Sequence, residues 1–220
     1  MRVLAIDLSG AGGGAALLTP EGVQSAVLPV EVRRGRDLLL AVKGLLGGQG
    51  VDDLDLVACG IGPGSFTGIR IAVSTVATLA YAAELPVLGV GSLHGVATNA
   101  PAEAEWVLAA LDARRDHVFC ALFRRTTEGL ELQGDYRHVP AAEAAAGLPG
   151  DAFIVGDAYS RYAEVFGGFG GTPEAHPRPG VIASVAAARF EAGEREDPVD
   201  LRPLYLRLSD PEVRRSGRES

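Results

Sequence analysis

The feature that most constrains the fold is an order of secondary-structure elements that occurs twice along the chain. In the first half, short apolar segments bounded by turn-forming residues predict strands, and apolar residues at helical spacing predict helices. We expect three strands at residues 3–6, 14–18 and 23–29, a helix at 37–46, a strand at 56–61, a helix at 66–83 and a strand at 87–90. A short helix capped by Ser92 follows. The continuous apolar run 56–61 is typical of a strand buried on both faces.

The second half repeats this order in a weaker form. Residues 106–112 are again an apolar segment that ends in an aspartate, as residues 1–7 are. Three further strands and a late helix are predicted at residues 118–123, 130–139, 153–156 and 181–192. Residues 167–179 are rich in glycine and proline, so a loop is expected there.

A duplicated βββαβαβα unit is the architecture of actin, the sugar kinases and the Hsp70-like ATPases, the ASKHA group with a ribonuclease H-like core. We therefore predict an α/β protein with the duplicated actin-like fold and a degenerate second lobe. The predicted boundaries are 1–100 for the first lobe, 101–208 for the second lobe and 209–220 for a polar tail.

Composition narrows the classes of partner. The chain has 20 Lys and Arg against 28 Asp and Glu, a net charge of −8, which disfavours direct binding to a nucleic-acid backbone. Cys59 and Cys120 lie in apolar runs outside any Cys/His cluster, which favours a reducing, cytoplasmic compartment. No apolar stretch approaches the roughly 20 residues that span a bilayer, so no membrane partner is expected.

The most specific motif lies between the strand 56–61 and the helix 66–83. It comprises Gly62, Pro63, Gly64, Ser65, Phe66, Thr67, Gly68 and Arg70. Glycines permit a tight turn at this point, and Ser65 or Thr67 is expected to cap the helix. Arg70 lies near the positive end of the helix dipole, so an acidic partner is expected for it. A Gly-Pro-Gly-Ser turn with a cap is also compatible with a purely structural role.

The full stretch resembles the Gly-Pro-Gly-Ser-Phe-Thr-Gly signature of the TsaB family, also called YeaZ. Further resemblances cover most of the chain and are strongest over residues 1–125; they fall at residues 4–7, 85–93, 111–115 and 203–207. The chain departs from the family pattern at residues 34–37, where the family has a His-Ser pair, at residues 8–10, and at Ala72, which replaces a glycine. These departures concern the partner surface.

The resemblance implies a non-catalytic subunit of the machinery that makes threonylcarbamoyladenosine (t6A) in tRNA. Such a subunit forms homodimers and supports a TsaD-like catalytic subunit, which carries the metal and transfers threonylcarbamoyl from its adenylate to adenosine of tRNA reading ANN codons. A TsaE-like ATPase is the third component. The tRNA would be reached only indirectly, through the complex.

The helices 37–46 and 66–83 are predicted to form the partner surface. The second helix carries small side chains on almost all of its sides, so another backbone could approach it closely. These residues are Ala72, Ser74, Thr75, Ala77, Thr78, Ala80, Ala82 and Ala83. The predicted interface residues are Leu39, Lys43, Arg70, Ser74, Ala77, Thr78 and Tyr81. Alternatively, the small residues fit the helix to its own sheet.

A rival prediction is a stand-alone small ATPase or phosphotransferase of the actin and sugar-kinase superfamily. Asp7, Ser9 and Gly12, in the Gly-rich loop 9–14, could then bind a nucleotide phosphate, although Asp7 is equally compatible with ordering the loop. The second half opposes this, because residues 112–115 lack an Asp-x-Gly turn and residues 156–158 retain a single glycine.

We therefore expect no catalytic residue and no tightly bound cofactor, with ATP or ADP bound only at a partner interface. His94, His117, His138 and His176 are dispersed and have no i, i+4 pair, so no metal site is predicted.

Overall fold

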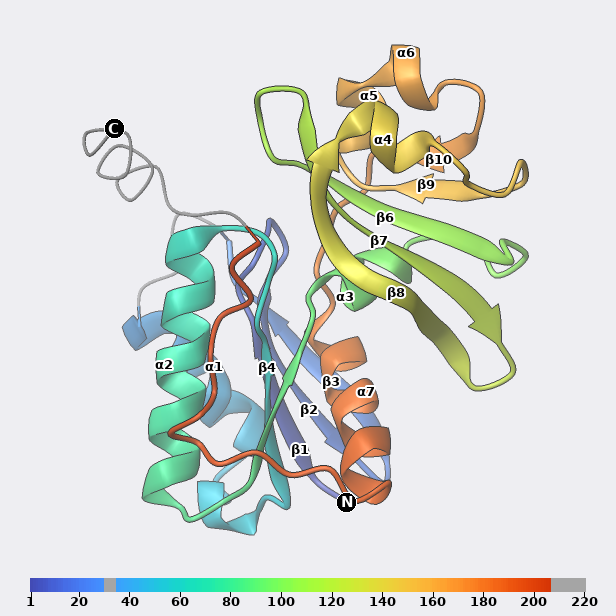
Figure 1. Ribbon diagram of the computed structural model, residues 1–220. Coiled ribbons are helices and arrows are strands. Elements are labelled where there is room, and N and C mark those ends of the chain that lie inside the picture. The colour runs from blue at the N-terminus through green and yellow to red at the C-terminus, as the bar shows by residue number, and fades with distance from the viewer. Residues whose placement is uncertain (30–34, 207–220) are drawn as a thin grey trace, which may run out of the picture.

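The computed structural model describes residues 1–29 and 35–206, which form two five-stranded sheets (Figure 1). The first sheet has the order β3-β2-β1-β4-β5. Its strands are β1 (Val3–Asp7), β2 (Gly14–Thr19), β3 (Gly22–Val27), β4 (Leu56–Gly60) and β5 (Val87–Val90). β1 pairs antiparallel with β2 and parallel with β4, and β5 continues the parallel side.

The second sheet has the same connectivity. Its strands are β6 (Trp106–Asp112), β7 (His117–Thr126), β8 (Gly129–Pro140), β9 (Phe153–Val155) and β10 (Gly170–Thr172). Read from β8, the order is β8-β7-β6-β9-β10, which corresponds strand for strand to the first sheet. The central strand again pairs antiparallel with the next strand and parallel with the fourth. The predicted duplication of an α/β unit is therefore confirmed.

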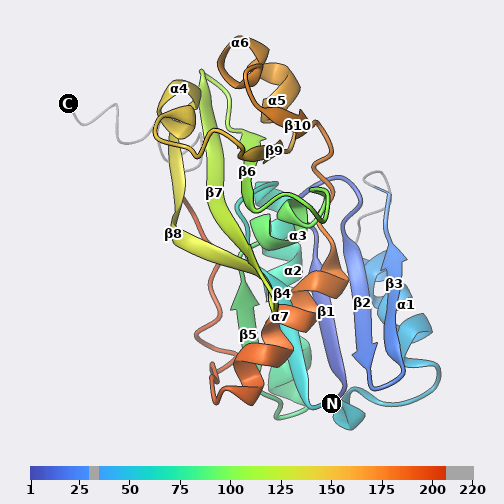
Figure 2. The ribbon, with the colours of Figure 1, turned by 90° about the vertical axis from the view of Figure 1, so that its right-hand side faces the viewer.

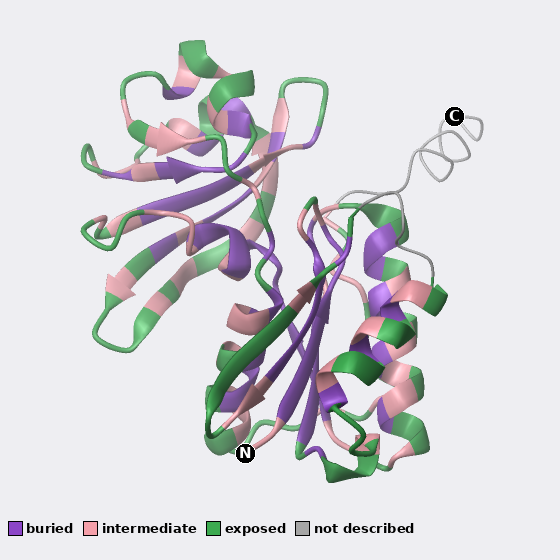
Figure 3. Ribbon diagram, turned by 180° about the vertical axis from the view of Figure 1, so that it is seen from behind, coloured by how far each residue is buried: buried purple, intermediate pink, exposed green. Residues whose placement is uncertain are grey.

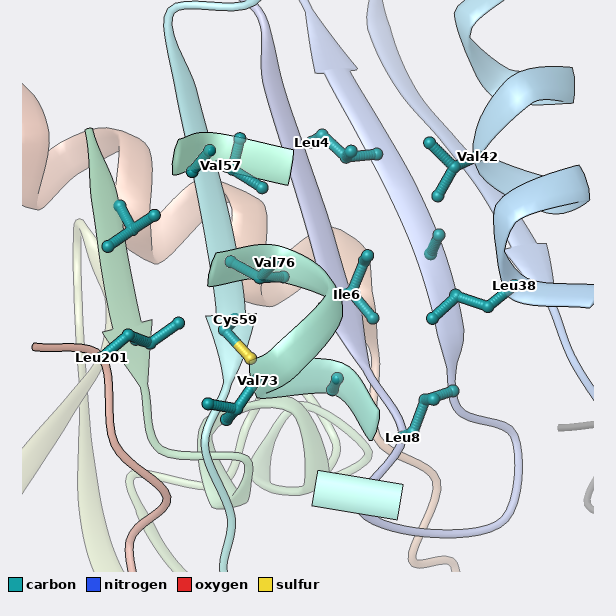
Figure 4. Close-up of a cluster of buried hydrophobic side chains, with 14 of the residues drawn as sticks. Leu4, Ile6, Leu8, Leu38, Val42, Val57, Cys59, Val73, Val76 and Leu201 are labelled. Atoms are coloured by element: carbon teal, nitrogen blue, oxygen red, sulfur yellow. The ribbon is translucent and has the colours of Figure 1, made fainter. Parts of the chain in front are cut away.

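Two long helices cover one face of the first sheet. These are α1 (Gly35–Leu46) and α2 (Phe66–Ala82), the latter within one residue of its predicted bounds. Figure 4 shows how Leu38 and Val42 of α1 and Val73 and Val76 of α2 meet the side chains of the central strands. Every residue of β1 and β4 is buried (Figure 3), because helices cover both faces of this sheet.

The two halves of the chain exchange their last helices. Short α3 (Leu93–Ala97) follows the first sheet in sequence but packs on the second, where Leu93 and Val96 lie against Val107 of β6. In return α7 (Pro179–Glu191) lies across the free face of the first sheet (Figure 2), in contact with β1 and β4. The sequence predicted a boundary between the lobes at residue 100, but α7, which lies after that boundary, packs on the first sheet.

The outer face of the second sheet has only short helices. They are α4 (Ala141–Ala145), α5 (Ala158–Arg161) and α6 (Ala163–Phe166), none of which was assigned bounds from the sequence. The fully buried Phe166 and Ile154 lie in the core beneath them. In the part of the chain that the structure describes, the helices on this face are thus shorter than α1 and α2, which cover the first sheet.

One predicted loop contains a strand. Residues 170–172 form β10, parallel to β9, although residues 167–179 were expected to be irregular. A Cβ atom at Gly171 would lie 2.5 Å from the Tyr159 ring, so this glycine is needed for close packing. A three-residue strand of two glycines and a threonine lacks the apolar run by which strands are detected.

After α7 the chain returns to the first lobe as a segment that we call the strap, residues 193–206 (Figure 1). Glu196 exchanges two backbone hydrogen bonds with Val87 of β5, and Leu201 is buried in the core beneath α2. The predicted polar tail, 209–220, lies outside the described residues. No helix among the described residues is long and apolar enough to cross a membrane.

Candidate functional site

The signature loop joins β4 to α2 and is tied to two other parts of the first lobe. Gly62 donates its N–H to the Ser92 hydroxyl at 3.0 Å and accepts the Ser92 N–H at 2.8 Å. Ser65 donates its N–H to the Ser9 carbonyl at 2.6 Å. The Ser65 hydroxyl accepts the Gly68 N–H at 3.3 Å, so Ser65 rather than Thr67 caps α2.

The signature glycines allow the first turn of α2 to lie against the loop after β1. A Cβ atom at Gly68 would lie 1.9 Å from the Leu8 carbonyl oxygen, and one at Gly64 would lie 2.3 Å from that of Ser9. Gly64 also has φ of 152°, which disfavours any other residue. The glycines therefore serve a close approach of two backbones.

Of the predicted nucleotide-binding residues, Asp7 lies deepest. It is fully buried, and its Oδ1 accepts the Ser9 N–H at 2.8 Å. A Cβ atom at Gly60 would lie 2.2 Å from the Asp7 Cγ, so the carboxylate lies against the end of β4. This geometry favours the ordering role for Asp7.

A cleft of about 510 Å³ lies between the two lobes, at the edge of the Gly-rich loop. Ser9 lines this cleft, whereas Gly12 lines a neighbouring groove of about 770 Å³ beside β3 and α7. Asp7 lines neither cavity. The structure therefore does not bring Asp7, Ser9 and Gly12 together around one cavity.

The chain's own connector between β10 and α7 packs on the Gly-rich loop. A Cβ atom at Gly10 would lie 3.2 Å from Pro177 Cδ and 3.5 Å from the Ala175 carbonyl oxygen. His176 Nδ1 lies 3.4 Å from the Ala11 carbonyl oxygen, to which it can donate a hydrogen bond. The backbone on which a phosphate would rest is thus in contact with residues 175–177.

The opposite wall of the cleft is acidic. Asp112 and Asp157 line this wall, Glu174 lines the cleft from the connector before α7, and no Lys or Arg lines the cleft among the described residues. Asp157 accepts the Asp112 N–H at 2.7 Å, and Asp112 accepts the Tyr162 hydroxyl at 2.7 Å. Burial, followed by the hydrogen bond to Asp112, raises the pKa of Tyr162 to about 12. Without a metal ion between them, such a wall repels the phosphates of a nucleotide.

The turn after β6 replaces the second phosphate loop of an active ATPase. Arg114, Arg115 and Asp116 have φ values of 64°, 53° and 60°. For arginine this left-handed region costs roughly 1–2 kcal/mol, whereas aspartate adopts it more readily. The sequence indicated that a glycine turn was lost here, but it did not predict three successive left-handed residues.

The predicted partner surface on α1 and α2 divides into exposed and buried positions. Leu39, Lys43, Arg70, Ser74, Thr78 and Tyr81 are exposed, and Ala77 is half-buried. Tyr81 is 70% exposed, an unusual position for a large aromatic side chain. Ala72 and Ala80 are fully buried, so these two small residues fit the helix to its own sheet. Of the departure at residues 34–37, Arg34 lies outside the described residues.

Arg70 has aromatic neighbours instead of the predicted acidic one. Its Cζ lies 3.8 Å from the centre of the Phe66 ring, and its Nε donates to the Tyr205 hydroxyl at 2.8 Å. Within the described residues Arg70 forms no ion pair. Tyr205 is 135 positions away along the chain, and the only sequence signal for it was the family resemblance of residues 203–207.

Comparisons with known proteins agree with the signature. A family model described as "TsaD: tRNA N6-adenosine threonylcarbamoyltransferase" matches residues 36–162. The chain is 30% identical to the tRNA threonylcarbamoyladenosine biosynthesis protein TsaB of Bacillus subtilis (strain 168), over 97% of each chain. The chain belongs to the TsaB family. A solved structure titled "YeaZ from Pseudomonas aeruginosa" has a TM-score of 0.83 and 30% identity, and covers 93% of this chain and 99% of that one.

Other TsaB relatives align over a shorter stretch. The TsaB of Escherichia coli (strain K12) is 36% identical over 134 residues, which are 59% of this chain and 58% of that protein. The alignment therefore spans less than two thirds of that relative.

Two of the four histidines of this TsaB-family chain lie side by side. His117 and His138, on neighbouring strands β7 and β8, have ring centres 5.0 Å apart, although the sequence suggested that all four histidines are dispersed. Within residues 1–29 and 35–206 no three His, Cys, Asp or Glu side chains are grouped as metal ligands would be. Cys59 and Cys120 are buried free thiols.

Proposed function

We propose that this chain is a non-catalytic subunit of the assembly that forms t6A in tRNA. It supports a TsaD-like catalytic subunit, which transfers threonylcarbamoyl from its adenylate to adenosine of tRNA reading ANN codons. Membership of the TsaB family supports this, because relatives in E. coli and B. subtilis are named as tRNA threonylcarbamoyladenosine biosynthesis proteins.

The observation that best supports a non-catalytic role is that the interlobe cleft is poorly suited to bind a nucleotide. In an ATPase of this fold, the loop after β1 and the turn after β6 present backbone N–H groups to the phosphates, and acidic side chains hold the metal. Here the first loop contacts residues 175–177, and the opposite wall carries Asp112 and Asp157. Neither wall offers a cation to the phosphates among the described residues, which disfavours the stand-alone ATPase.

The partner surface is the exposed side of α1 and α2. Leu39 and Tyr81 are 49% and 70% exposed and supply apolar contact area. Between Arg70 and Tyr81 the exposed residues of α2 are the small Ser74 and Thr78, which permit close approach of another helix. Aromatic residues and arginine, here Tyr81 and Arg70, are enriched at protein interfaces.

We propose the same surface for the homodimer of the isolated chain. A TsaE-like ATPase completes the assembly, and tRNA is contacted only through the complex, as the net charge of −8 favours. ATP or ADP is bound only at the junction with the partner. A t6A-forming complex acts on tRNA in the cytoplasm, which is the location proposed for this chain.

Co-purification with the TsaD-like protein tests the partner surface. Thr78→Arg places a large charge at the centre of the exposed face of α2 and should abolish capture. Thr127→Arg is the matched control, because Thr127 is also exposed but lies in the turn between β7 and β8. Undiminished capture by the Thr78 variant, or equal loss in both, would refute this surface. Ala80 is unsuitable for such a test, since it is fully buried.

Calorimetry with Mg-ATP on the isolated chain tests the rival function. We expect no binding tighter than a Kd of roughly 10 μM, or about −7 kcal/mol. Tighter binding together with ATP turnover that is lost in Asp7→Ala would establish a stand-alone ATPase and overturn the proposal.

A further inference from the structure

Arg70 is an exposed cation whose charge has no counterpart in the described chain. It lies one turn after Phe66, the first residue of α2, near the N-terminal end of the helix, where the dipole disfavours positive charge. The ion pairs of the described residues involve Arg124, Arg137 and Arg189, but not Arg70. The exposed residues around it on α2, Thr67 and Ser74, are uncharged.

Two aromatic side chains nevertheless hold the guanidinium in one place. Its Cζ lies 3.8 Å from the centre of the Phe66 ring and 5.8 Å from that of Tyr205. The two rings are 5.4 Å apart and tilted by 30°. Nε donates to the Tyr205 hydroxyl at 2.8 Å. This contact uses Nε and leaves the two terminal nitrogens of the fork to a ligand.

The strap fixes Tyr205 itself. Leu201 is 3% exposed and belongs to the core beneath α2. The Leu204 N–H donates to the Ile61 carbonyl at 2.8 Å, immediately before the signature loop. Tyr205 is therefore anchored on its N-terminal side, while its own side chain is 46% exposed. The strap thus places the Tyr205 hydroxyl at the edge of the proposed partner surface.

We propose that Phe66 and Tyr205 position Arg70 to bind a carboxylate of the protein partner through its two terminal nitrogens. This rests on the proposed function and names a determinant of the same surface. An arginine fork matches a carboxylate in a bidentate pair, and prior immobilisation lowers the entropic cost of forming that pair. Arginine and tyrosine are also the residue types that dominate binding energy at protein interfaces.

A carboxylate fits this position better than a nucleic-acid phosphate. Binding to a phosphate backbone draws on several cations, because each neutralised phosphate releases counterions. Arg70 stands alone among uncharged residues on the exposed side of α2, in a chain with a net charge of −8. Arg70 and Tyr205 are thus expected to determine affinity for an acidic protein surface.

The test is the Kd of the full-length chain for the purified TsaD-like protein at low and high salt. Tyr205→Phe keeps the ring and removes the hydroxyl that accepts the Nε proton, and should weaken binding about 5- to 10-fold without changing Tm. Arg70→Lys keeps the charge but loses the fork, and should weaken binding about 10-fold or more. Arg70→Ala should also reduce the dependence of Kd on salt.

Arg124→Lys is the matched control. Arg124 is likewise exposed and lies 5.4 Å from the Trp106 ring, but on β7 of the second lobe. Wild-type affinity in Tyr205→Phe and Arg70→Lys, equal weakening in Arg124→Lys, or an unchanged salt dependence in Arg70→Ala would each overturn the inference. Binding of tRNA by the isolated chain that is lost in Arg70→Ala would assign Arg70 to phosphate instead. Failure of the wild-type chain to bind the TsaD-like protein would overturn the proposed function as well.

Discussion

Replacing Gly68 with alanine should destabilise the first lobe, although alanine is the better helix former. The new Cβ would lie 1.9 Å from the Leu8 carbonyl oxygen, closer than folded proteins tolerate, so the loop after β1 has to move by an ångström or more. Overpacking of this kind costs about 1–3 kcal/mol. Loss of the hydrogen bond from Ser65 to the Ser9 carbonyl adds about 1 kcal/mol. Helix propensity returns about 1 kcal/mol, which leaves a net loss of roughly 1–3 kcal/mol.

Urea or thermal unfolding of the isolated chain measures this loss. For a chain of this size, each kcal/mol lowers Tm by about 2–4 °C. Gly44→Ala is the matched control, because Gly44 is an exposed glycine inside α1 with no atom within 4 Å of a built Cβ. It should gain up to about 1 kcal/mol. A Gly68 variant as stable as the Gly44 variant would refute the view that the signature glycine serves backbone packing.

Two further predictions concern titratable groups whose pKa values are shifted by burial. Burial lowers the pKa of His94 to about 4, from about 6.5 in the unfolded chain. The unfolded chain therefore binds the extra proton between these values, so stability should fall by up to about 3 kcal/mol from pH 7 to pH 4. In urea unfolding His94→Gln should lose less over this range, and an equal loss would contradict the assignment. Burial also raises the pKa of the Cys59 and Cys120 thiols; both should resist a disulfide-exchange reagent at pH 8 until guanidinium unfolds the chain, and rapid labelling would show otherwise.

Much of the first lobe could be predicted because its signals are local. The bounds of α2 follow from a serine cap at Ser65 and from apolar residues at helical spacing. The strands β1 and β4 follow from continuous apolar runs, as expected for strands covered on both faces. The second lobe was harder, because α4, α5 and α6 have only four or five residues each and offer no periodicity to detect.

The site was predicted less completely than the fold. The sequence marked Asp7, Ser9 and Gly12 as one loop, but it could not indicate that residues 175–177 would pack on that loop. Nor could it assign Arg70 its neighbour, because an arginine near a helix start suggests an acid, and the observed partner is a tyrosine hydroxyl. The candidate interface residues on α1 and α2 remain predictions until partner binding is measured.

By itself the sequence determined the repeated order of strands and helices, the buried central strands and the turn chemistry of the signature loop. These properties depend on residues within a few positions of one another, so spacing and residue type are sufficient to specify them. Only the tertiary structure decided that α7 covers the first sheet, that Asp7 lies against Gly60, and that Tyr205 meets Arg70. Each of these depends on which distant surfaces pack together, and an apolar or polar pattern specifies that a face is buried without specifying its partner.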